Sequence, residues 1–283
     1  MAIKVELINP VFGARVTGLN PVSTLQDSEF AEVRRLFEQH SVLVLPNQPM
    51  DDEQQIAFSE RFGALERTIS SNPAGGTAFA RQSNIDIKTG ETIAPDDRRM
   101  MYQKANMLWH ADSTFKETQS LCSLLSAREV PEEGGATDFA STRSVYEGLT
   151  EAEQSELDGL IVEHDIIYSR QIVGFEFTNK EREEMQAVRH PLVQVNPATG
   201  RKSLLIGAHA KCIVGWPFEK GRALLDKLDE RATRPENTFS HHWKSGDLVI
   251  WDNRSAIHRA TPYDTLKYRR LMQRTTVSYQ PAA

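Results

Sequence analysis

The last third of the chain consists mainly of short strand-like segments, and this pattern limits the folds that the chain can adopt. The segments are PLVQV, SLLIG, TFSHHW, DLVIWDN, SAIHRA and YRRLMQRTTVSY, and one helical segment, FEKGRALLDKLDERA, interrupts them. Many short strands in succession are typical of β-sandwiches and jelly rolls. Since the other helical patterns lie mainly earlier, we predict a mainly β fold in which α-helical buttresses cover a β-sandwich or jelly-roll core.

The earlier part of the chain supplies the helices for these buttresses. Helical spacing runs through residues 25–40, with Asp27 and Ser28 as candidate caps, and through DEQQIAFSERF, which follows Asp51. The buried strand pattern SVLVLP separates the two, and SLCSLLSAREV predicts a later strand. A further helix is predicted over residues 142–160. Amphipathic helices of this kind usually cover a sheet.

Between residues 70 and 104 the regular patterning weakens. SSNPAGGTAF is a polar stretch that contains glycine, and SNIDIKTGETI predicts a hairpin that turns at Thr89 and Gly90. A loop of this length inside a compact domain is uncommon unless it is functional or disordered. We therefore expect residues 70–104 to form a lid over an active site, with a plain surface loop as the alternative.

Length and terminal sequence favour one domain inside the cell. The 283 residues contain no internal repeat, no low-complexity tract and no Pro/Gly/Ser linker, so we expect one domain over residues 1–283. No apolar run approaches the roughly 18 residues of a membrane span. The first residues, MAIKVELINP, lack the charged and then apolar layout of a signal peptide. We therefore expect a cytoplasmic protein without a membrane partner.

Charge and cysteine content exclude other classes of partner and site. A net charge of −6 argues against a nucleic-acid surface, because neutralising phosphates requires clustered Lys and Arg. Cys122 and Cys212 stand alone without CxxC spacing, which favours buried free thiols over a disulfide or a zinc site. A protein that acts on small molecules therefore remains open.

The segment LWHADSTF holds the first candidate site, the pair His110 and Asp112. In an extended strand, side chains at i and i+2 project to the same face, so an imidazole and a carboxylate would lie together there. The chain has eight His and 39 Asp plus Glu among 283 residues, so about one such pair is expected by chance. Taken alone, the pair favours a structural role over a chemical one.

The candidate third group is His258, in WDNRSAIHRATPYD, although its apolar neighbours are equally typical of a core histidine. Shortly after it comes YRRLMQR, in which strand alternation puts Arg270, Met272 and Arg274 on one face. Two guanidiniums on an inward-looking face are costly to bury unless each meets an anion. The pattern therefore indicates a ligand that carries a carboxylate.

These motifs, in their order along the chain, resemble the TauD/TfdA group of Fe(II)- and 2-oxoglutarate-dependent dioxygenases. The matching segments are VFGARVTGL, QQIAFSERFG, LWHADSTF, GGATDFA, SGDLVIWDNRSAIHR and RRLMQRTTV. About 145 residues separate the HxD pair from the distal His, and the resemblance covers nearly the whole chain. It implies a double-stranded β-helix (jelly-roll) core. It also implies that His110, Asp112 and His258 bind catalytic iron as a facial triad, with open positions for 2-oxoglutarate and O2.

The resemblance further implies roles for five residues. Thr137 and Arg270 match the positions that hold the distal carboxylate of 2-oxoglutarate through charge-assisted hydrogen bonds. Asn106 matches a position close to cosubstrate and substrate. Arg274 matches the position that binds the anionic head of the substrate, with a surface ion pair as the alternative. His209, in LLIGAHA, resembles a stretch of the herbicide-cleaving members, and core packing is an equally good explanation for it.

The resemblance leaves two substrate classes open. TGRKSLLIGAHA and WDNR favour an aryloxyalkanoate, whose hydroxylation next to the ether oxygen gives a phenol and an oxo acid, with release of succinate and CO2. The alternative is a sulfonate or alkyl sulfate ester dioxygenase. Thr68 and Ser71 stand where the taurine enzyme has His and Tyr, and the lysine of the aryloxyacetate enzymes is also missing there. The family is commonly dimeric or tetrameric, which implies a homo-oligomer that acts on a small anionic substrate.

A different class of protein also fits two His and one Asp. Such a set binds zinc, so the chain could be a zinc hydrolase or a module with a structural metal. A hydrolase would not need the pair Thr137 and Arg270, which argues for the dioxygenase. Asp112 argues for hydroxylation in particular, because the family's halogenases replace this carboxylate with a small residue.

Overall fold

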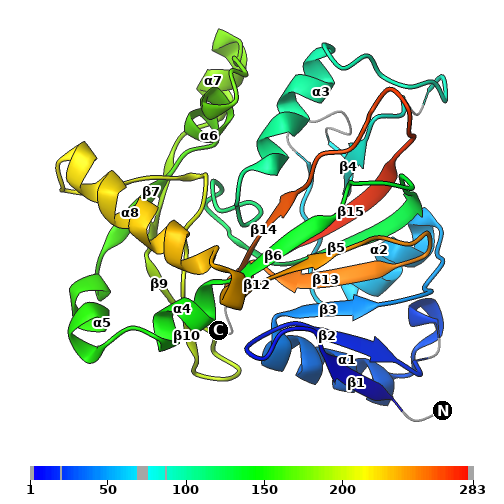
Figure 1. Ribbon diagram of the computed structural model, residues 1–283, viewed down its shortest axis with the longest axis horizontal. Helices are drawn as coiled ribbons and strands as arrows, with labels where there is room; N and C mark the ends of the chain where they lie inside the picture. Colours follow the sequence, from blue (N-terminus) through cyan, green and yellow to red (C-terminus); the bar gives the residue numbers. More distant parts are fainter. Residues whose placement is uncertain (1–2, 20, 69–75, 87, 280–283) are drawn as a thin grey trace.

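The computed structural model describes residues 3–19, 21–68, 76–86 and 88–279, and its centre is a pair of β-sheets (Figure 1). The larger sheet has seven strands in the order β1 (Lys4–Leu7), β2 (Ala14–Thr17), β3 (Val42–Leu45), β13 (Leu248–Asp252), β5 (Ser120–Glu129), β15 (Leu271–Ser278) and β4 (Phe79–Ser83). The smaller sheet has three strands in the order β12 (Thr238–His241), β6 (Thr137–Ser141) and β14 (Ala256–Ala260). Apart from the parallel pair β2 and β3, the strand pairs in both sheets are antiparallel.

The two sheets pack face to face through large side chains. Phe139 on β6 and Trp251 on β13 come from opposite sheets, and their ring centroids are 5.7 Å apart. Trp251 also lies 4.5 Å from the ring of His258 on β14, and both Phe139 and Trp251 are fully buried. Two antiparallel sheets that share one core in this way form the expected jelly roll. The predicted mainly β fold is confirmed.

Helices cover the outer face of the larger sheet. On β3, Val42 and Val44 pack between the sheets, whereas Leu43 and Leu45 face α1 (Asp27–His40) and α2 (Asp52–Glu60). The sequence of β3 is continuously apolar because the strand is buried on both faces. The helices act as the predicted buttresses (Figure 1).

A second layer of small sheets and helices flanks the jelly roll on the α8 side (Figure 1). Its strands are β7 (Ile161–His164), β8 (Val188–Pro191), β9 (Val193–Val195), β10 (Lys202–Leu204) and β11 (Ala210–Ile213). Its helices are α4 (Thr142–Glu147), α5 (Glu151–Leu157) and α8 (Phe218–Ala232). The remaining helices are α3 (Arg98–Gln103), α6 (Ile166–Ile172) and α7 (Asn179–Glu184), together with the short 3-10 helices η1 (Val22–Thr24), η2 (Lys104–Met107) and η3 (Pro235–Asn237).

Two helix predictions need correction. The first helix begins at Asp27, and its N-cap is Gln26, whose backbone N–H donates to the Glu29 carboxylate (2.9 Å), instead of Asp27 or Ser28. The predicted helix over residues 142–160 is two helices. α4 ends at Gly148, and Thr150 then caps α5 by accepting from the backbone N–H of its third residue. A new cap so soon after a glycine restarts the helix in another direction.

Residues 70–104 are not one long loop. Phe79–Ser83 forms β4, which pairs with β15 at the edge of the larger sheet, and Arg98–Gln103 forms α3. The predicted hairpin turn is present, because Ile85 bridges to Thr92 and Gly90 adopts a φ of +74°. Residues 70–75 and 87 lie outside the described part of the chain. A lid role for this segment stays a prediction.

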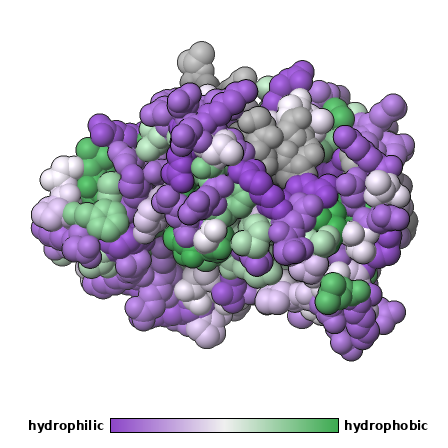
Figure 2. All heavy atoms as spheres, turned by 90° about the horizontal axis from the view of Figure 1, so that it is seen from above, coloured by the Kyte–Doolittle hydropathy of each residue, from purple (hydrophilic) through white to green (hydrophobic). Residues whose placement is uncertain are grey.

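Both cysteines are free thiols, as predicted, but only Cys122 is buried, since Cys212 is partly exposed on β11. Among the described residues, no helix combines the length and the apolar character needed to cross a bilayer. On the face shown in Figure 2, hydrophilic side chains predominate and apolar ones form small separate patches. Scattered exposed apolar residues of this kind are ordinary for a globular protein.

Candidate active site

His110, Asp112 and His258 meet at one buried point of the jelly roll. Their ligand atoms all lie within 4.8 Å of one another, and all three residues are buried. His110 and His258 form an isolated antiparallel bridge with N–O distances of 3.0 and 2.8 Å, which brings the HxD segment beside β14. The structure thus brings together the three groups predicted to converge. The predicted geometry was only partly right, because Asp112 lies in a turn and not in an extended strand.

A hydrogen bond orients the His110 imidazole toward the carboxylate, whereas Nδ1 of His258 has no hydrogen-bond partner among the described residues. His110 Nδ1 lies 2.7 Å from the carbonyl oxygen of Leu108, which can only accept, so the proton is on Nδ1 and the Nε2 lone pair is free. Nε2 of His110 and Nε2 of His258 each lie 3.8 Å from a different oxygen of Asp112. Burial lowers the pKa of His110 to about 4 and that of His258 well below its usual value. Both rings are therefore neutral at pH 7, the form that binds metals.

A polar network holds Asp112 in its ionised form. Burial alone would raise its pKa, but the positive charge of Arg274 and the neighbouring imidazoles bring it down to about 2. Arg274 Nη1 donates to Oδ1 at 2.5 Å, and the Ser123 hydroxyl donates to Oδ2 at 2.7 Å. The Asp112 backbone N–H donates to Asn253 Oδ1, which also accepts from the Trp251 indole, both at 3.0 Å. The carboxylate is fixed before any metal binds.

One pocket beside the triad contains an uncompensated cation. Arg270 is buried, and no carboxylate of the described residues lies within ion-pair distance of it. Its Nη1 donates to the Gln82 carbonyl at 3.0 Å, and its guanidinium lies 5.8 Å from the centre of the Tyr263 ring. Burial lowers the pKa of Arg270 to about 10, so it keeps its charge at neutral pH. A buried guanidinium without an acid suits an anionic ligand.

Thr137 lines the same pocket. Its hydroxyl oxygen accepts from the Trp243 indole N–H at 3.0 Å, which leaves the hydroxyl proton available to a ligand. His110, His258, Thr137 and Arg270 all line this pocket, so an anion bound by Arg270 would lie near the triad. The side chains present therefore fit a metal that is chelated by a dicarboxylic ligand.

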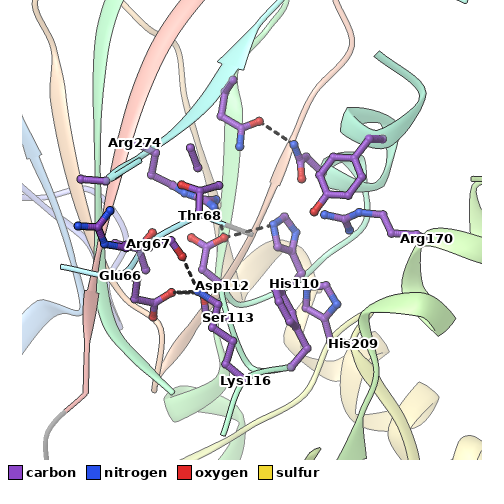
Figure 3. A pocket seen from close by; sticks show the side chains of 17 residues that line it. Glu66, Arg67, Thr68, His110, Asp112, Ser113, Lys116, Arg170, His209 and Arg274 are labelled. Carbon is purple, nitrogen blue, oxygen red and sulfur yellow. Dashed lines mark hydrogen bonds and ion pairs between the residues drawn. The ribbon is translucent and has the colours of Figure 1, made fainter. Parts of the chain in front are cut away.

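A second pocket adjoins the triad, and all of the residues labelled in Figure 3 line it. Gln82, Asn106, His110 and Arg274 line both pockets, and the Asn106 amide donates to Gln82 Oε1 at 2.6 Å. Asn106 thus lies where the two pockets meet, and its closeness to cosubstrate and substrate stays a prediction. Thr68 lines the second pocket, whereas Ser71 lies outside the described residues.

His209 lies in the wall of the second pocket and is also packed. Its Nδ1 is 2.9 Å from the Ser169 hydroxyl, and its ring lies edge-on to His110 (5.9 Å) and to Phe115 (4.9 Å). Burial, with a smaller effect of Arg170, places its pKa well below the usual value, so the ring is neutral. The structure gives His209 both the pocket position and the core packing considered from the sequence.

The sequence interpretation missed several residues of the site, and four of them support or accompany the predicted ones. Ser123 and Asn253 orient Asp112, Trp243 orients Thr137, and Arg170 on α6 lines the second pocket. Asn253 lies within the WDNR segment, which was recognised as a motif without a role for its asparagine. No pattern in the sequence around Arg170 indicates a role in the site, because its side chain reaches the pocket only through the position of α6 in the fold.

The absence of a side chain at Gly207 allows the HxD segment to pack closely against it. A substitution at Gly207 therefore tests the position of His110. A Cβ at this residue would be 2.9 Å from the Trp109 carbonyl oxygen and 3.0 Å from His110 Cα. We therefore expect Gly207→Ala to displace His110, to lower the free energy of unfolding by about 1–3 kcal/mol, and to weaken Mn(II) binding. Thermal unfolding and titration with Mn(II) would measure both effects.

The matched control is Gly200→Ala. Gly200 also has a positive φ, +69° against +104° at Gly207, but a Cβ there would meet nothing within 4 Å. Both variants therefore carry a backbone cost, and only Gly207→Ala adds the collision. Equal Mn(II) affinity in the two variants would contradict the proposed role of the contact.

Comparisons with known proteins agree with this geometry. The family model described as "Taurine catabolism dioxygenase TauD, TfdA family" matches residues 4–276. An α-ketoglutarate-dependent 2,4-dichlorophenoxyacetate dioxygenase of Burkholderia sp. (strain RASC) is 39% identical, covering 98% of this chain and 95% of that protein. An (S)-phenoxypropionate/α-ketoglutarate dioxygenase of Sphingobium herbicidovorans is 34% identical, covering 100% of this chain and 97% of its own.

A solved structure and a more distant relative complete the comparison. The crystal structure of AAD-2 in complex with Mn(II) and N-oxalylglycine has a TM-score of 0.91 and 37% identity, covering 99% of this chain and 98% of that one. An alkylsulfatase of Acinetobacter baylyi is 32% identical, covering 94% of this chain and 82% of its own. The chain belongs to the TauD/TfdA family of 2-oxoglutarate-dependent dioxygenases.

Proposed function

We propose that the protein hydroxylates a small aryloxyalkanoate, with 2-oxoglutarate and O2 as cosubstrates. Two electrons from the oxidative decarboxylation of 2-oxoglutarate and two from the substrate C–H bond reduce O2. One oxygen atom goes to succinate and the other to the substrate. When the hydroxylated carbon also carries the ether oxygen, the hemiacetal loses the phenol and leaves an oxo acid. The observation that carries the proposal is the buried, unpaired Arg270 beside two neutral imidazoles and an ionised carboxylate.

His110 Nε2, Asp112 and His258 Nε2 would hold the metal. Two neutral nitrogens and one carboxylate on one side of an ion are the donors of a facial triad, which suits Fe(II). Bound iron supplies the activation of dioxygen that drives the hydroxylation. The protein's own contribution is to fix the ligands beforehand, through Ser123 and Asn253 at the carboxylate, and to place the cosubstrate.

We assign Arg270 and Thr137 to the distal carboxylate of 2-oxoglutarate. The guanidinium supplies charge and the hydroxyl supplies one further donor, and Asn106 lies at the boundary with the second pocket. A hydrolytic zinc site would have no use for such an anion site. Addition of Fe(II) and 2-oxoglutarate without oxygen is therefore expected to colour the protein, because a keto acid chelated to Fe(II) absorbs visible light and a zinc complex does not. A colourless complex would contradict the assignment.

The second pocket would hold the substrate. Arg274 contributes positive charge next to the triad, and we propose that it contacts the anionic group of the substrate. Phe115 and Tyr102 supply aromatic wall for an aryl ring, and His209 shapes the same wall. Binding at both ends would present the carbon next to the carboxylate to the metal. The lid role of residues 70–104 belongs to this proposal, since Ala78, Ala80 and Tyr102 of that segment line the pocket.

The test is 2-oxoglutarate consumption by the Fe(II)-loaded protein with a panel of aryloxyalkanoates, sulfonates and alkyl sulfate esters. Stimulation by aryloxyalkanoates, with release of the phenol, is the expected result. Stimulation by sulfate esters alone would favour the second candidate, an alkyl sulfate or sulfonate dioxygenase, which the similarity to the Acinetobacter alkylsulfatase supports. Inactivity with the entire panel would reject both substrate classes.

The proposal also includes the localisation, the oligomeric state and the partners of the protein. We expect a cytoplasmic homo-oligomer, dimer or tetramer, whose only ligands are small molecules, because the family is commonly oligomeric and the net charge of −6 disfavours nucleic acid. Light scattering coupled to size-exclusion chromatography would give the oligomeric state, and a monomeric mass would contradict the expectation.

A further inference from the structure

Arg170 is a buried cation in the second pocket that the family motifs do not account for. It lies on α6, is only 5% exposed and lines the pocket together with His110 and His209. Its guanidinium carbon stacks 4.5 Å from the centre of the Tyr102 ring. Its Nε is buried and has no hydrogen-bond acceptor, and no carboxylate of the described residues lies within ion-pair distance. Within the described part of the chain, its charge is therefore compensated only by the face of an aromatic ring.

The partly buried cations of this pocket, Lys116 and Arg274, already have acids. Lys116 Nζ lies 2.6 Å from the Glu66 carboxylate, and Arg274 Nη1 is bound to Asp112. Arg67 is exposed, so water compensates its charge. A cation–π contact offsets part of the cost of burying a guanidinium, but an uncompensated charge and an unmatched N–H remain costly. Arg170 therefore differs from its neighbours in having unused capacity for an anion.

Local structure holds Arg170 in place. The Asp165 side chain caps α6 by accepting from the backbone N–H groups of Ile167 (2.8 Å) and Tyr168 (3.2 Å), and the Asp165 N–H donates to the His209 carbonyl (2.8 Å). The residue before Arg170 is Ser169, whose hydroxyl contacts the His209 ring. One turn of α6 thus positions both the neutral His209 ring and the Arg170 guanidinium in the wall of the same pocket.

We propose that Arg170 binds the anionic group of the substrate and so determines the specificity for carboxylates. The inference rests on the proposed function and extends it, because it adds a second arginine to Arg274. In Figure 3 the two arginines lie on opposite sides of His110. Arg274 is engaged by Asp112, whereas Arg170 is not engaged by any acid of the described residues. A substrate carboxylate would supply the missing acceptor for Nε and the missing negative charge.

A purely structural role for Arg170 is the competing explanation, since its stacking on Tyr102 joins α6 to α3. The two explanations differ in how they depend on the charge of the substrate. A binding role makes the effect of removing Arg170 depend on the carboxylate. A structural role makes it the same for charged and neutral substrates.

The experiment is a cycle of two proteins and two substrates, the wild type and Arg170→Gln with 2,4-dichlorophenoxyacetate and its primary amide. We expect the variant to raise KM for the acid by about tenfold or more, with a smaller change in kcat, because a charge-assisted hydrogen bond is lost. With the amide, the two proteins should have similar KM values. Arg170→Lys, which keeps the charge but not the planar fork, should be intermediate.

The matched control is Arg61→Gln. Arg61 also stacks on an aromatic ring, 4.3 Å from the centre of Phe30, but it pairs with Asp27 and does not line the pocket. Its removal should leave KM unchanged for both substrates. A readout independent of turnover is calorimetric binding of 2,4-dichlorophenoxyacetate to protein loaded with Mn(II) and N-oxalylglycine, for which Arg170→Gln should raise Kd by about tenfold or more.

The outcomes separate the inference from the function on which it rests. Wild-type turnover of the acid with an unchanged KM in Arg170→Gln, or an equal rise in KM for acid and amide, would overturn the role of Arg170 and leave the proposed function intact. Wild-type protein that neither binds nor turns over the acid would overturn the proposed substrate class and the inference together.

Discussion

Asp112→Ala is expected to abolish substrate-stimulated 2-oxoglutarate consumption and to weaken Mn(II) binding by at least about a hundredfold. Loss of residues that merely orient metal ligands already costs about 10- to 100-fold in metal affinity, and Asp112 supplies the only negative charge of the triad. Titration with Mn(II) measures the effect on the metal directly, whereas activity alone would not separate metal loss from misfolding.

Two further variants keep this result interpretable. Removal of Asp112 also leaves Arg274 without its acid, so the Ala variant loses a buried ion pair as well as a ligand. Asp112→Asn keeps an oxygen that can accept from Arg274, and it should fold with nearly normal stability yet still bind Mn(II) poorly. Asp138→Asn is the control, because Asp138 pairs with Arg259 on the small sheet and is not part of the triad. Normal Mn(II) affinity in Asp112→Ala would place the metal elsewhere.

The features that the sequence predicted well are those that depend on strand periodicity. Arg270 and Arg274 were assigned to one face with Met272, and both arginines line the pocket that Thr137 also lines, while Met272 is fully buried. The Gln273 side chain lies on the opposite face, where its amide donates to the Asp52 carboxylate of α2 (3.3 Å). The alternation of side chains between two faces is a property of the extended backbone itself. It therefore does not depend on the residues that pack against the strand.

The features that the sequence did not predict depend on contacts between distant segments. Arg170 lies 60 residues beyond His110 in the chain and reaches the same pocket only because α6 is attached to the His209 segment. Trp243 lies two residues after β12 and donates one hydrogen bond to Thr137 on β6, a contact that no local pattern predicts. The HxD geometry was inferred from an extended strand, but the turn at Asp112 and the bridge from His110 to His258 produce it.

Arg270→Gln is the second large effect, and it should separate cosubstrate binding from folding. The guanidinium is buried without an acid, so its replacement by a neutral amide should leave the free protein at least as stable as the wild type. The same change should raise KM for 2-oxoglutarate by about a hundredfold or more, because a bidentate, charge-assisted contact is lost. Steady-state kinetics and thermal unfolding without ligand measure the two effects.

Arg269→Gln provides the matched control for Arg270→Gln. Arg269 is the preceding residue, but it is exposed, pairs with Glu129 at 2.9 Å and does not line the pocket. Its removal should leave KM for 2-oxoglutarate unchanged. Added 2-oxoglutarate, with Mn(II) present, should raise the unfolding temperature of the wild type and of Arg269→Gln, since a ligand stabilises the state that binds it.

The same addition should leave the unfolding temperature of Arg270→Gln almost unaltered. The buried charge costs stability in the free protein and is compensated only when an anion is bound. If Arg270 binds the cosubstrate, the variant should therefore have an equal or higher unfolding temperature without ligand. It should also lose the increase in unfolding temperature that 2-oxoglutarate causes in the wild type. A structural role predicts lower stability in both conditions. A variant that is destabilised without ligand but keeps its normal KM would therefore show that Arg270 supports the fold and that the cosubstrate carboxylate is held by other groups.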